Sequence, residues 1–253
     1  MKLNWTLLLS VFCLNVYAAE DFSTTSEKLK SALQSEVRGE ADTVRDRNRK
    51  PIRTMEFFGF RDDMKVLELI PGGGWYTKIL APTLAESGEL YVSIGTTRVE
   101  ENLLKQPGFE KVKVIPFQRE NFLPRAAGER QSGLKPFSFG ATGFDMALTF
   151  RNLHNFNQAA RINTGVAVFE ALKAGGLFGV IDHTRRHMQA DDNENRRRLD
   201  PVLVIKELES VGFELVDYSD LHYRPDDELR YEVGRKTVTG NTDRFTLLFR
   251  KPG

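Results

Sequence analysis

The sequence of 253 residues predicts an α/β fold in which helices cover both faces of a seven-stranded, mostly parallel sheet. Two observations carry this prediction. Short apolar segments rich in Val, Ile and Leu alternate with amphipathic segments from residue 65 onward, as expected for strands and crossover helices of a buried parallel sheet. The first apolar segment also runs directly into three glycines, a common strand-to-helix turn in such sheets. The length suits one domain with a full hydrophobic core.

The elements follow one another in a regular order. Seven strands are expected at 65–69, 89–94, 111–117, 144–150, 177–182, 213–219 and 244–251. Helices are expected at 76–86, 99–105, 158–173 and 201–211. The last two strands have no helix between them, so they are expected to pair antiparallel at one edge of the sheet. Residues 124–143, rich in Gly, Pro, Ser and Arg, are expected to form a long loop.

The amino-terminal residues have the three-part pattern of a secretory signal peptide. Lys2 precedes an apolar stretch over residues 7–16, and small residues follow at Ala18 and Ala19. The apolar stretch is shorter than the roughly 20 residues that a membrane-spanning helix needs. We therefore expect a signal peptide at 1–18, a periplasmic or secreted protein, and no stable membrane insertion after cleavage. Cys13 is the only cysteine, so the mature chain has no disulfide and no cysteine nucleophile.

Residues 19–58 are expected to form an amino-terminal helical segment in front of the main domain at 59–253. Residues 24–48 are polar with sparse apolar positions, which predicts a loosely packed surface helix that ends before Pro51. Lys plus Arg total 36 and Asp plus Glu total 35, so a nucleic-acid partner is not expected. The basic clusters at 45–50 and 196–198 are interpreted as solvated helix faces.

The stretch VLELIPGGGWYTKIL, residues 66–80, suggests a ligand loop. Glycines let the backbone approach a ligand at the carboxyl end of a strand, and the next helix begins with its amides directed at that ligand. Glu68 stands where its carboxylate reaches the loop or a ligand amine. The loop is not a nucleotide-hydrolase phosphate loop, because neither Ser nor Thr follows Lys78, and a dinucleotide fingerprint would need a glycine at Tyr76 or later.

The segment E-L-I-P-G-G-G resembles motif I of the class I S-adenosylmethionine-dependent methyltransferases. Other segments resemble, more narrowly, a bacterial family of predicted and often exported methyltransferases; they are RDRNRKPIRTMEFFGF, FDMALTFRNLHNF, GLFGVIDH, LDPVLVIKELESVGFELV and TDRFTLLFRKP. The resemblance spans the chain from the first of these segments to its end. It implies the Rossmann-like class I methyltransferase fold, S-adenosylmethionine as cofactor and a small molecule as acceptor.

Position by position, the resemblance implies a set of cofactor-binding residues: Glu68, Pro71, Gly72, Gly73, Gly74, Tyr76 and Gln118. Ile70 stands where the first glycine of the motif belongs. Because a β-branched residue does not easily adopt a positive φ, this turn is expected to differ from the usual one. The acid that binds the ribose hydroxyls is missing from the end of the second strand, where Ser93 and Thr96 stand instead.

Catalytic groups are expected in RNLHN, directly after the fourth strand. Arg151 is a candidate for binding an acidic ligand group, Asn152 and Asn155 for orienting the acceptor, and His154 for acting as the base. The alternative is that His154 caps the strand and the asparagines shape a turn.

Two other functions remain open from the sequence. One is an exported, non-catalytic small-ligand-binding protein on a degenerate methyltransferase fold, which the altered glycine turn and the missing ribose acid favour. The other is a metal-assisted hydrolase built on His183, His187 and Asp191, since the two histidines would share one face of a helix. The leading interpretation contains no metal.

Overall fold

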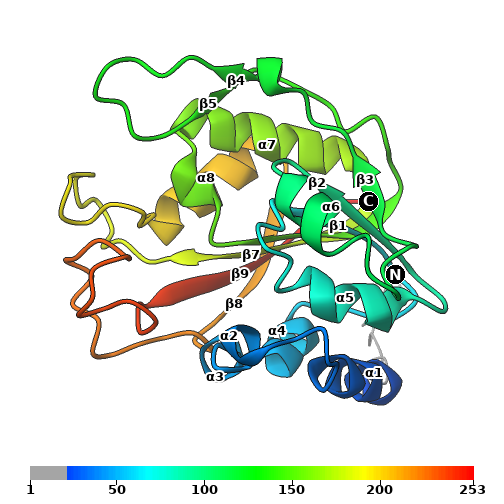
Figure 1. The fold of residues 1–253 in the computed structure, drawn as a ribbon. Helices are drawn as coiled ribbons and strands as arrows, with labels where there is room; N and C mark the ends of the chain where they lie inside the picture. Colours follow the sequence, from blue (N-terminus) through cyan, green and yellow to red (C-terminus); the bar gives the residue numbers. More distant parts are fainter. Residues whose placement is uncertain (1–21) are drawn as a thin grey trace, which may run out of the picture.

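A computed structural model describes residues 22–253 and contains a seven-stranded sheet with helices on both faces (Figure 1). The predicted signal peptide at 1–18 lies outside the described residues. The strands of the main sheet are β1 (Lys65–Leu69), β2 (Glu89–Ser93), β3 (Lys113–Ile115), β6 (Phe144–Phe150), β7 (Leu172–His183), β8 (Glu214–Ser219) and β9 (Arg244–Arg250). Among the residues described, no helix has both the length and the apolar character needed to cross a membrane.

The strand order β3-β2-β1-β6-β7-β9-β8 confirms the predicted sheet. The five strands from β3 to β7 are parallel, whereas β9 runs antiparallel to both β7 and the edge strand β8. The order reverses between β1 and β6, which places a crevice at the carboxyl ends of these two strands. Ligands of open α/β sheets bind at such a reversal point.

The helices and short elements complete the fold. The helices are α1 (Ser23–Leu33), α2 (Glu40–Thr43), α3 (Asp46–Arg49), α4 (Pro51–Phe57), α5 (Thr77–Leu84), α6 (Thr97–Asn102), α7 (Gln158–Ala171) and α8 (Pro201–Val211). Two single 3₁₀ turns, η1 (Arg119–Asn121) and η2 (Leu153–Asn155), follow β3 and β6. The predicted loop at 124–143 is not wholly irregular, because β5 (Gly133–Leu134) pairs antiparallel with β4 (Phe122–Leu123).

The prediction of one loosely packed helix over 24–48 was wrong. The segment forms three helices, and α1 is firmly packed, with Leu29 fully buried in the same hydrophobic cluster as residues of α4 and α5. Gly39 takes an extended conformation at the start of α2. The buried guanidinium of Arg38 stabilises the chain between these helices. It donates to the carbonyl oxygen of Leu33 at 2.8 Å and to the carboxylate of Asp46 at 2.5 Å.

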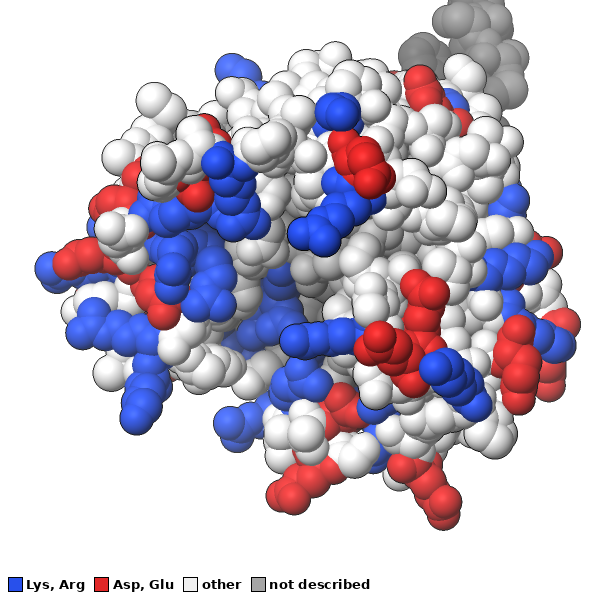
Figure 2. Space-filling view, turned by 45° about the horizontal axis from the view of Figure 1, so that its top comes forward, with Lys and Arg blue, Asp and Glu red and all other residues white. Residues whose placement is uncertain are grey.

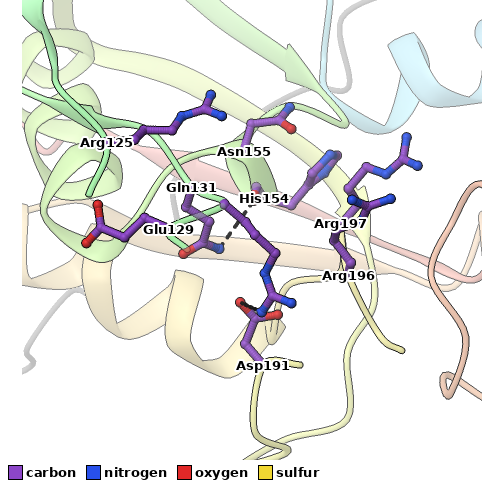
Figure 3. A pocket seen from close by; sticks show the side chains of 9 residues that line it. Arg125, Glu129, Gln131, His154, Asn155, Asp191, Arg196 and Arg197 are labelled. Carbon is purple, nitrogen blue, oxygen red and sulfur yellow. Dashed lines mark hydrogen bonds and ion pairs between the residues drawn. The ribbon is translucent and has the colours of Figure 1, made fainter. Parts of the chain in front are cut away.

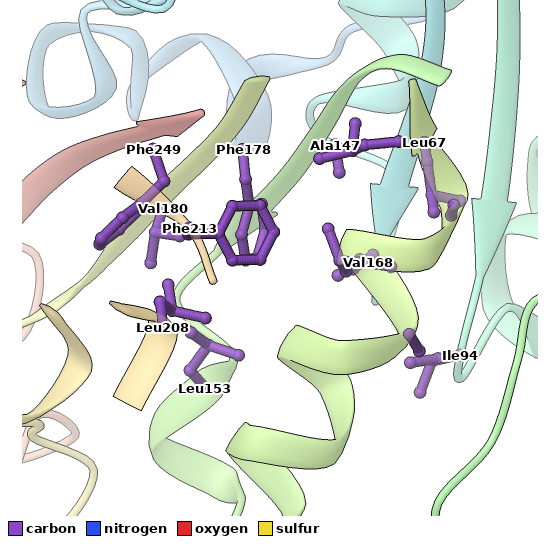
Figure 4. Packing of buried hydrophobic residues seen from close by; sticks show 14 of the residues in the cluster. Leu67, Ile94, Ala147, Leu153, Val168, Phe178, Val180, Leu208, Phe213 and Phe249 are labelled. Atoms are coloured by element: carbon purple, nitrogen blue, oxygen red, sulfur yellow. The ribbon is translucent and has the colours of Figure 1, made fainter. Parts of the chain in front are cut away.

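Two hydrophobic clusters cover opposite faces of the sheet and make it a rigid base for the loops at its edge. On the face of α7 and α8, Phe178, Phe213 and Phe249 lie together beside Leu208 (Figure 4). The opposite cluster joins α1, α4, α5 and α6 to the sheet. The amino-terminal helices are therefore part of the domain's core packing and reach the crevice between β1 and β6.

Candidate functional site

Three neighbouring strands end in residues with left-handed backbone. Ile70 after β1, Ile94 after β2 and Arg151 after β6 have φ values of 53°, 61° and 63°. Such values are unusual for residues other than glycine and costly for β-branched ones. The expectation that Ile70 would avoid a positive φ was therefore wrong. Strained backbone persists only where the surroundings hold it, and here it gathers at the crevice edge of the sheet.

Hydrogen bonds from Asn152 help to hold Ile70 in its left-handed conformation. Its side-chain Nδ2 donates to the carbonyl oxygen of Ile70 and to that of Phe150, each at 3.1 Å. The amide of Ile70 in turn donates to the carbonyl oxygen of Ser93 at 2.9 Å. Asn152 thus ties the glycine turn to the end of β6, as in the alternative that the asparagines shape a turn.

A cavity of about 160 Å³ lies against the glycine turn. It is lined by Arg45, Arg49, Glu68, Ile70, Pro71, Gly72, Gly73, Trp75, Tyr76, Phe150, Arg151 and Asn152. A Cβ added at Gly72 or Gly73 would meet nothing within 4 Å, so this backbone is open to a ligand. Gly74 has another function, because its Cβ would lie 2.6 Å from Leu103 of the segment after α6. The ring of Tyr76 is stacked on Phe150 and forms a wall of the cavity.

Two arginines of this cavity lack an anionic partner. Arg49 is only 5% exposed, and Arg151 is partly buried. Neither guanidinium has a hydrogen bond or an ion pair with any of residues 22–253, although Arg49 lies over the ring of Trp75 at 4.2 Å. Burial, and after it the positive charge of Arg151, lower the pKa of Arg49 to about 9. The interpretation of residues 45–50 as a solvated helix face was thus wrong for Arg49.

Glu68 lies at the base of the same cavity and is almost completely buried. Burial raises the pKa of its carboxyl group to about 7, while a hydrogen bond from Thr77 at 2.6 Å and the charge of Arg49 act in the opposite direction. Glu68 therefore changes protonation close to neutral pH. Its position beside unpaired guanidiniums suits a ligand that carries both an anionic and a cationic group.

The end of β2 offers few free polar groups to a ligand. Ser93 is fully buried and donates to the carbonyl oxygen of Ile115 at 3.0 Å, and Thr96 donates to the carboxylate of Glu100. Gln118 is exposed before η1 and lines neither this cavity nor the one described next. The structure thus gathers six of the seven predicted cofactor-binding residues near the glycine turn but leaves Gln118 apart from them.

His154 and Asp182 form a buried pair at the ends of β6 and β7. The imidazole Nδ1 of His154 lies 2.5 Å from Oδ1 of Asp182, whose Oδ2 accepts the backbone amide of His154 at 3.0 Å. An ionised carboxylate only accepts hydrogen bonds, so we assign the proton to Nδ1 and a free lone pair to Nε2. The sequence pointed to His154 as a base but not to its pairing with Asp182, because the pairing depends on the register of β6 with β7.

His154 lines a second cavity, of about 430 Å³. Its other lining residues are Arg125, Glu129, Arg130, Gln131, Asn155, Asp191, Arg196 and Arg197. Figure 3 shows Arg125 and Glu129 on one side of this cavity, Arg196 and Arg197 on the other, and His154 with Asn155 between them. The RNLHN segment therefore faces two cavities: Arg151 and Asn152 line the one at the glycine turn, and His154 and Asn155 line this one.

The basic cluster at 196–198 is not a solvated helix face. None of its residues is helical, Arg196 and Arg197 line the second cavity, and Arg198 is 1% exposed. The guanidinium of Arg198 forms a buried ion pair with Asp227 at 2.8 Å. Nothing in the sequence RRR indicated that the three arginines would lie in different surroundings.

The residues proposed for a metal site do not converge. His183 is buried with Nδ1 2.8 Å from the hydroxyl of Thr242, whereas His187 is exposed with Nδ1 2.9 Å from Asp200. Asp191 forms ion pairs with arginines instead. Within residues 22–253, no three His, Cys, Asp or Glu side chains are grouped as a metal site requires. The helix that would have aligned the histidines does not form, since β7 extends to His183 and irregular chain follows.

Comparison with known structures identifies the architecture. At 15% identity and a TM-score of 0.56, a SAM-dependent methyltransferase from Aquifex aeolicus aligns over 89% of this chain and 97% of its own. The chain has the class I methyltransferase fold. The [4+2]-cyclase SpnF aligns at 15% identity and a TM-score of 0.52, over 91% of this chain and 93% of its own. The glycopeptide N-methyltransferase MtfA, in complex with sinefungin, aligns at 14% identity and a TM-score of 0.52, over 81% and 87%.

The class I methyltransferase fold alone does not define the reaction, because one of these proteins is described as a cyclase. No protein-family profile matches the chain, and no curated protein matches it.

Proposed function

We propose that the protein is an S-adenosylmethionine-dependent methyltransferase that acts on a small molecule. The observation that carries the proposal is the pairing of His154 with Asp182 in the segment after β6, whose first residues Arg151 and Asn152 line the cavity at the glycine turn of a class I methyltransferase fold. This arrangement combines an open backbone loop for a ligand with a histidine whose Nε2 is free to accept a proton. Methyl transfer needs little more from a protein than positioning and, for a protonated acceptor, a base.

The residues of the cavity at the glycine turn fit the amino-acid end of S-adenosylmethionine. Arg49 and Arg151 are unpaired guanidiniums that would hold its carboxylate, and Glu68 would receive its ammonium group. The open backbone at Gly72 and Gly73 would lie along the ligand. Bound there, the cofactor would supply a methyl group on a positively charged sulfur.

His154 would act on the acceptor molecule in this proposal. Its Nε2 would take the proton that the acceptor's hydroxyl or amine loses as the nucleophile forms its new bond to carbon. Asp182 would hold the ring orientation and stabilise the positive charge that the imidazole gains. Asn155 is exposed at the same cavity and would orient the acceptor.

Calorimetric titration of residues 19–253 with S-adenosylmethionine and S-adenosylhomocysteine tests the cofactor assignment. We expect both to bind, and Arg49→Gln and Arg151→Gln each to weaken binding by about tenfold or more, the effect of losing a charge-assisted hydrogen bond. Arg47→Gln is the matched control, since Arg47 is exposed on α3 and outside the cavity. Absence of heat at millimolar cofactor would overturn the proposal.

One observation favours a second function, non-catalytic binding of a small ligand. Ser93 and Thr96, the polar residues that stand in place of the ribose-binding acid, are both engaged in internal hydrogen bonds. Incubation with methyl-labelled S-adenosylmethionine and pooled small acceptors separates the two functions. Transfer of label supports the enzyme, whereas cofactor-independent binding of an unmodified ligand supports the binding protein.

The amino-terminal pattern further leads us to propose that the protein is exported. An exported methyltransferase would need its cofactor outside the cytoplasm. Binding of S-adenosylmethionine in the calorimeter, together with export, would therefore imply a supply of the cofactor in that compartment.

A further inference from the structure

The cavity at His154 carries more positive charge than the rest of the protein. Four of its nine lining residues are arginines and two are carboxylates, although the whole chain has nearly equal numbers of basic and acidic residues. Figure 2 shows Lys and Arg side chains gathered around a hollow on one face of the molecule, with fewer Asp and Glu side chains among them. A hollow lined by one sign of charge concentrates its field and attracts the opposite charge.

Two carboxylates, Glu129 and Asp191, line this cavity, but neither is paired with Arg125. Glu129 accepts a hydrogen bond from the backbone amide of Ala126 at 3.1 Å. Asp191 is shared, because it lies 3.4 Å from Arg130 and 3.5 Å from Arg185. Arg125 has no carboxylate partner within the described chain and donates instead to the neutral hydroxyl of Ser132 at 2.7 Å. This side therefore keeps guanidinium groups with unfilled hydrogen-bonding capacity.

The same holds on the opposite side of the cavity. Arg196 and Arg197 share the carboxylate of Glu232, at 3.8 Å and 2.8 Å. Both arginines are exposed and consecutive in sequence, and their side chains lie together in Figure 3. Two guanidiniums that share one carboxylate leave a full positive charge available to a ligand.

We propose that this cavity binds the phosphate group of a small phosphate ester and presents the rest of that molecule to His154. The planar guanidinium group matches a phosphate through two parallel hydrogen bonds, and several arginines together match its double negative charge. That the ester is the methyl acceptor rests on the function proposed above. The phosphate site itself rests only on the charges and the shape of the cavity.

The volume of the cavity indicates a small molecule as the source of the phosphate. About 430 Å³ is within the usual range for small-molecule sites. Arg196 and Arg197 would hold the phosphate on one side and Arg125 on the other, while Asn155 and Gln131 offer amide groups to the uncharged part. A proton on the ligand's hydroxyl would then lie near Nε2 of His154.

Calorimetry with glycerol phosphate, and with glycerol as the uncharged control, tests the phosphate site. Both titrations are run on residues 19–253 at constant ionic strength, since salt screens such contacts. We expect binding of glycerol phosphate alone. The double variant Arg196→Gln/Arg197→Gln is expected to weaken it by about tenfold or more, in line with the loss of charge-assisted hydrogen bonds. Arg98→Gln, on the exposed side of α6, is the matched control and is expected to have no effect.

Two results would overturn the phosphate site: no binding of glycerol phosphate at millimolar concentration, or binding that the double variant leaves unchanged. Retained affinity in the double variant together with loss in Arg49→Gln would place the anion at the glycine turn instead. S-adenosylmethionine is titrated into the same variants. If S-adenosylmethionine does not bind but glycerol phosphate does, the methyltransferase proposal is contradicted and the phosphate site is retained. If S-adenosylmethionine binds but glycerol phosphate does not, the phosphate site is contradicted and the methyltransferase proposal is retained.

Discussion

Asp182 accepts two hydrogen bonds from His154, one from the ring Nδ1 at 2.5 Å and one from the backbone amide at 3.0 Å. A third comes from the amide of His183 at 2.7 Å. These contacts fix both the position of the imidazole and its rotation about the side chain. A histidine held in this way has its Nδ1 committed to the protein, and this one lines the cavity.

The pairing predicts the tautomer of His154. We expect nitrogen NMR of the labelled protein to show Nδ1 protonated and Nε2 unprotonated near pH 8, with His154→Gln assigning the signals among the four histidines. Asp182→Asn is expected to abolish this preference. Once an acceptor is known, either substitution is expected to slow methyl transfer by about 10²- to 10⁴-fold, the usual effect of a general base. Protonation at Nε2 with a bare Nδ1 would contradict the assigned role.

Asn152 is expected to be needed for stability. Asn152→Ala removes the donor to the carbonyl oxygens of Ile70 and Phe150 and is expected to lower the free energy of unfolding by about 1–3 kcal/mol. Denaturant unfolding measures this change. Asn155→Ala in the same motif is the control and is expected to stay within about 0.5 kcal/mol of the parent, because Asn155 is exposed. Equal effects of the two substitutions would mean that Asn152 does not hold the turn.

Glu68 is expected to make the folded state less stable as the pH rises. Burial raises its pKa from 4.5 to about 7, so the folded protein keeps a proton that the unfolded chain has already lost between these values. Stability therefore falls across this window, by about 3 kcal/mol in total, and stays low above it. Relative to the parent, Glu68→Gln should gain that amount between pH 4.5 and 8 in denaturant unfolding. Glu120→Gln, an exposed position, should gain nothing.

His222 is expected to have the opposite pH dependence. Burial lowers its pKa from 6.5 to about 4. The ring Nδ1 is hydrogen-bonded to the hydroxyl of Thr246, and Nε2 to the carbonyl oxygen of Arg49. As the pH falls from 6.5 to 4, the unfolded chain binds a proton first, so stability is lost. His222→Gln should remove this acid-side loss. In the parent the two slopes oppose each other between pH 4.5 and 6.5, and each single variant should expose the other slope.

Cleavage of the signal peptide is open to direct measurement. Expression of the full chain in a bacterium is expected to give an exported protein whose mass corresponds to a mature chain that begins at Ala19. Ala18→Arg or Ala18→Glu should block processing, because the peptidase requires a small residue there. Retention of the intact chain in the cytoplasm would exclude export.

Periodicity and turn chemistry in the sequence were sufficient to determine the architecture. The strands at 65–69 and 144–150 and the helix at 201–211 agree with the structure at both ends, because apolar runs and caps such as Asp200 are local signals. The same alternation predicted the order of elements, and the glycine turn predicted where a ligand crevice would lie. These features depend on neighbours along the chain.

The charges and partners of the site were decided only by the tertiary structure. Arg49 is buried because α3 brings it over the rings of Trp75 and Tyr76, and Asp182 meets His154 because β6 and β7 pair in one register. The left-handed backbone of Ile70 contradicts its local preference and is held by Asn152, 82 residues away in sequence. Burial and pairing between distant segments depend on how the elements pack, and packing also sets the pKa values and the unpaired arginines on which the proposed chemistry depends.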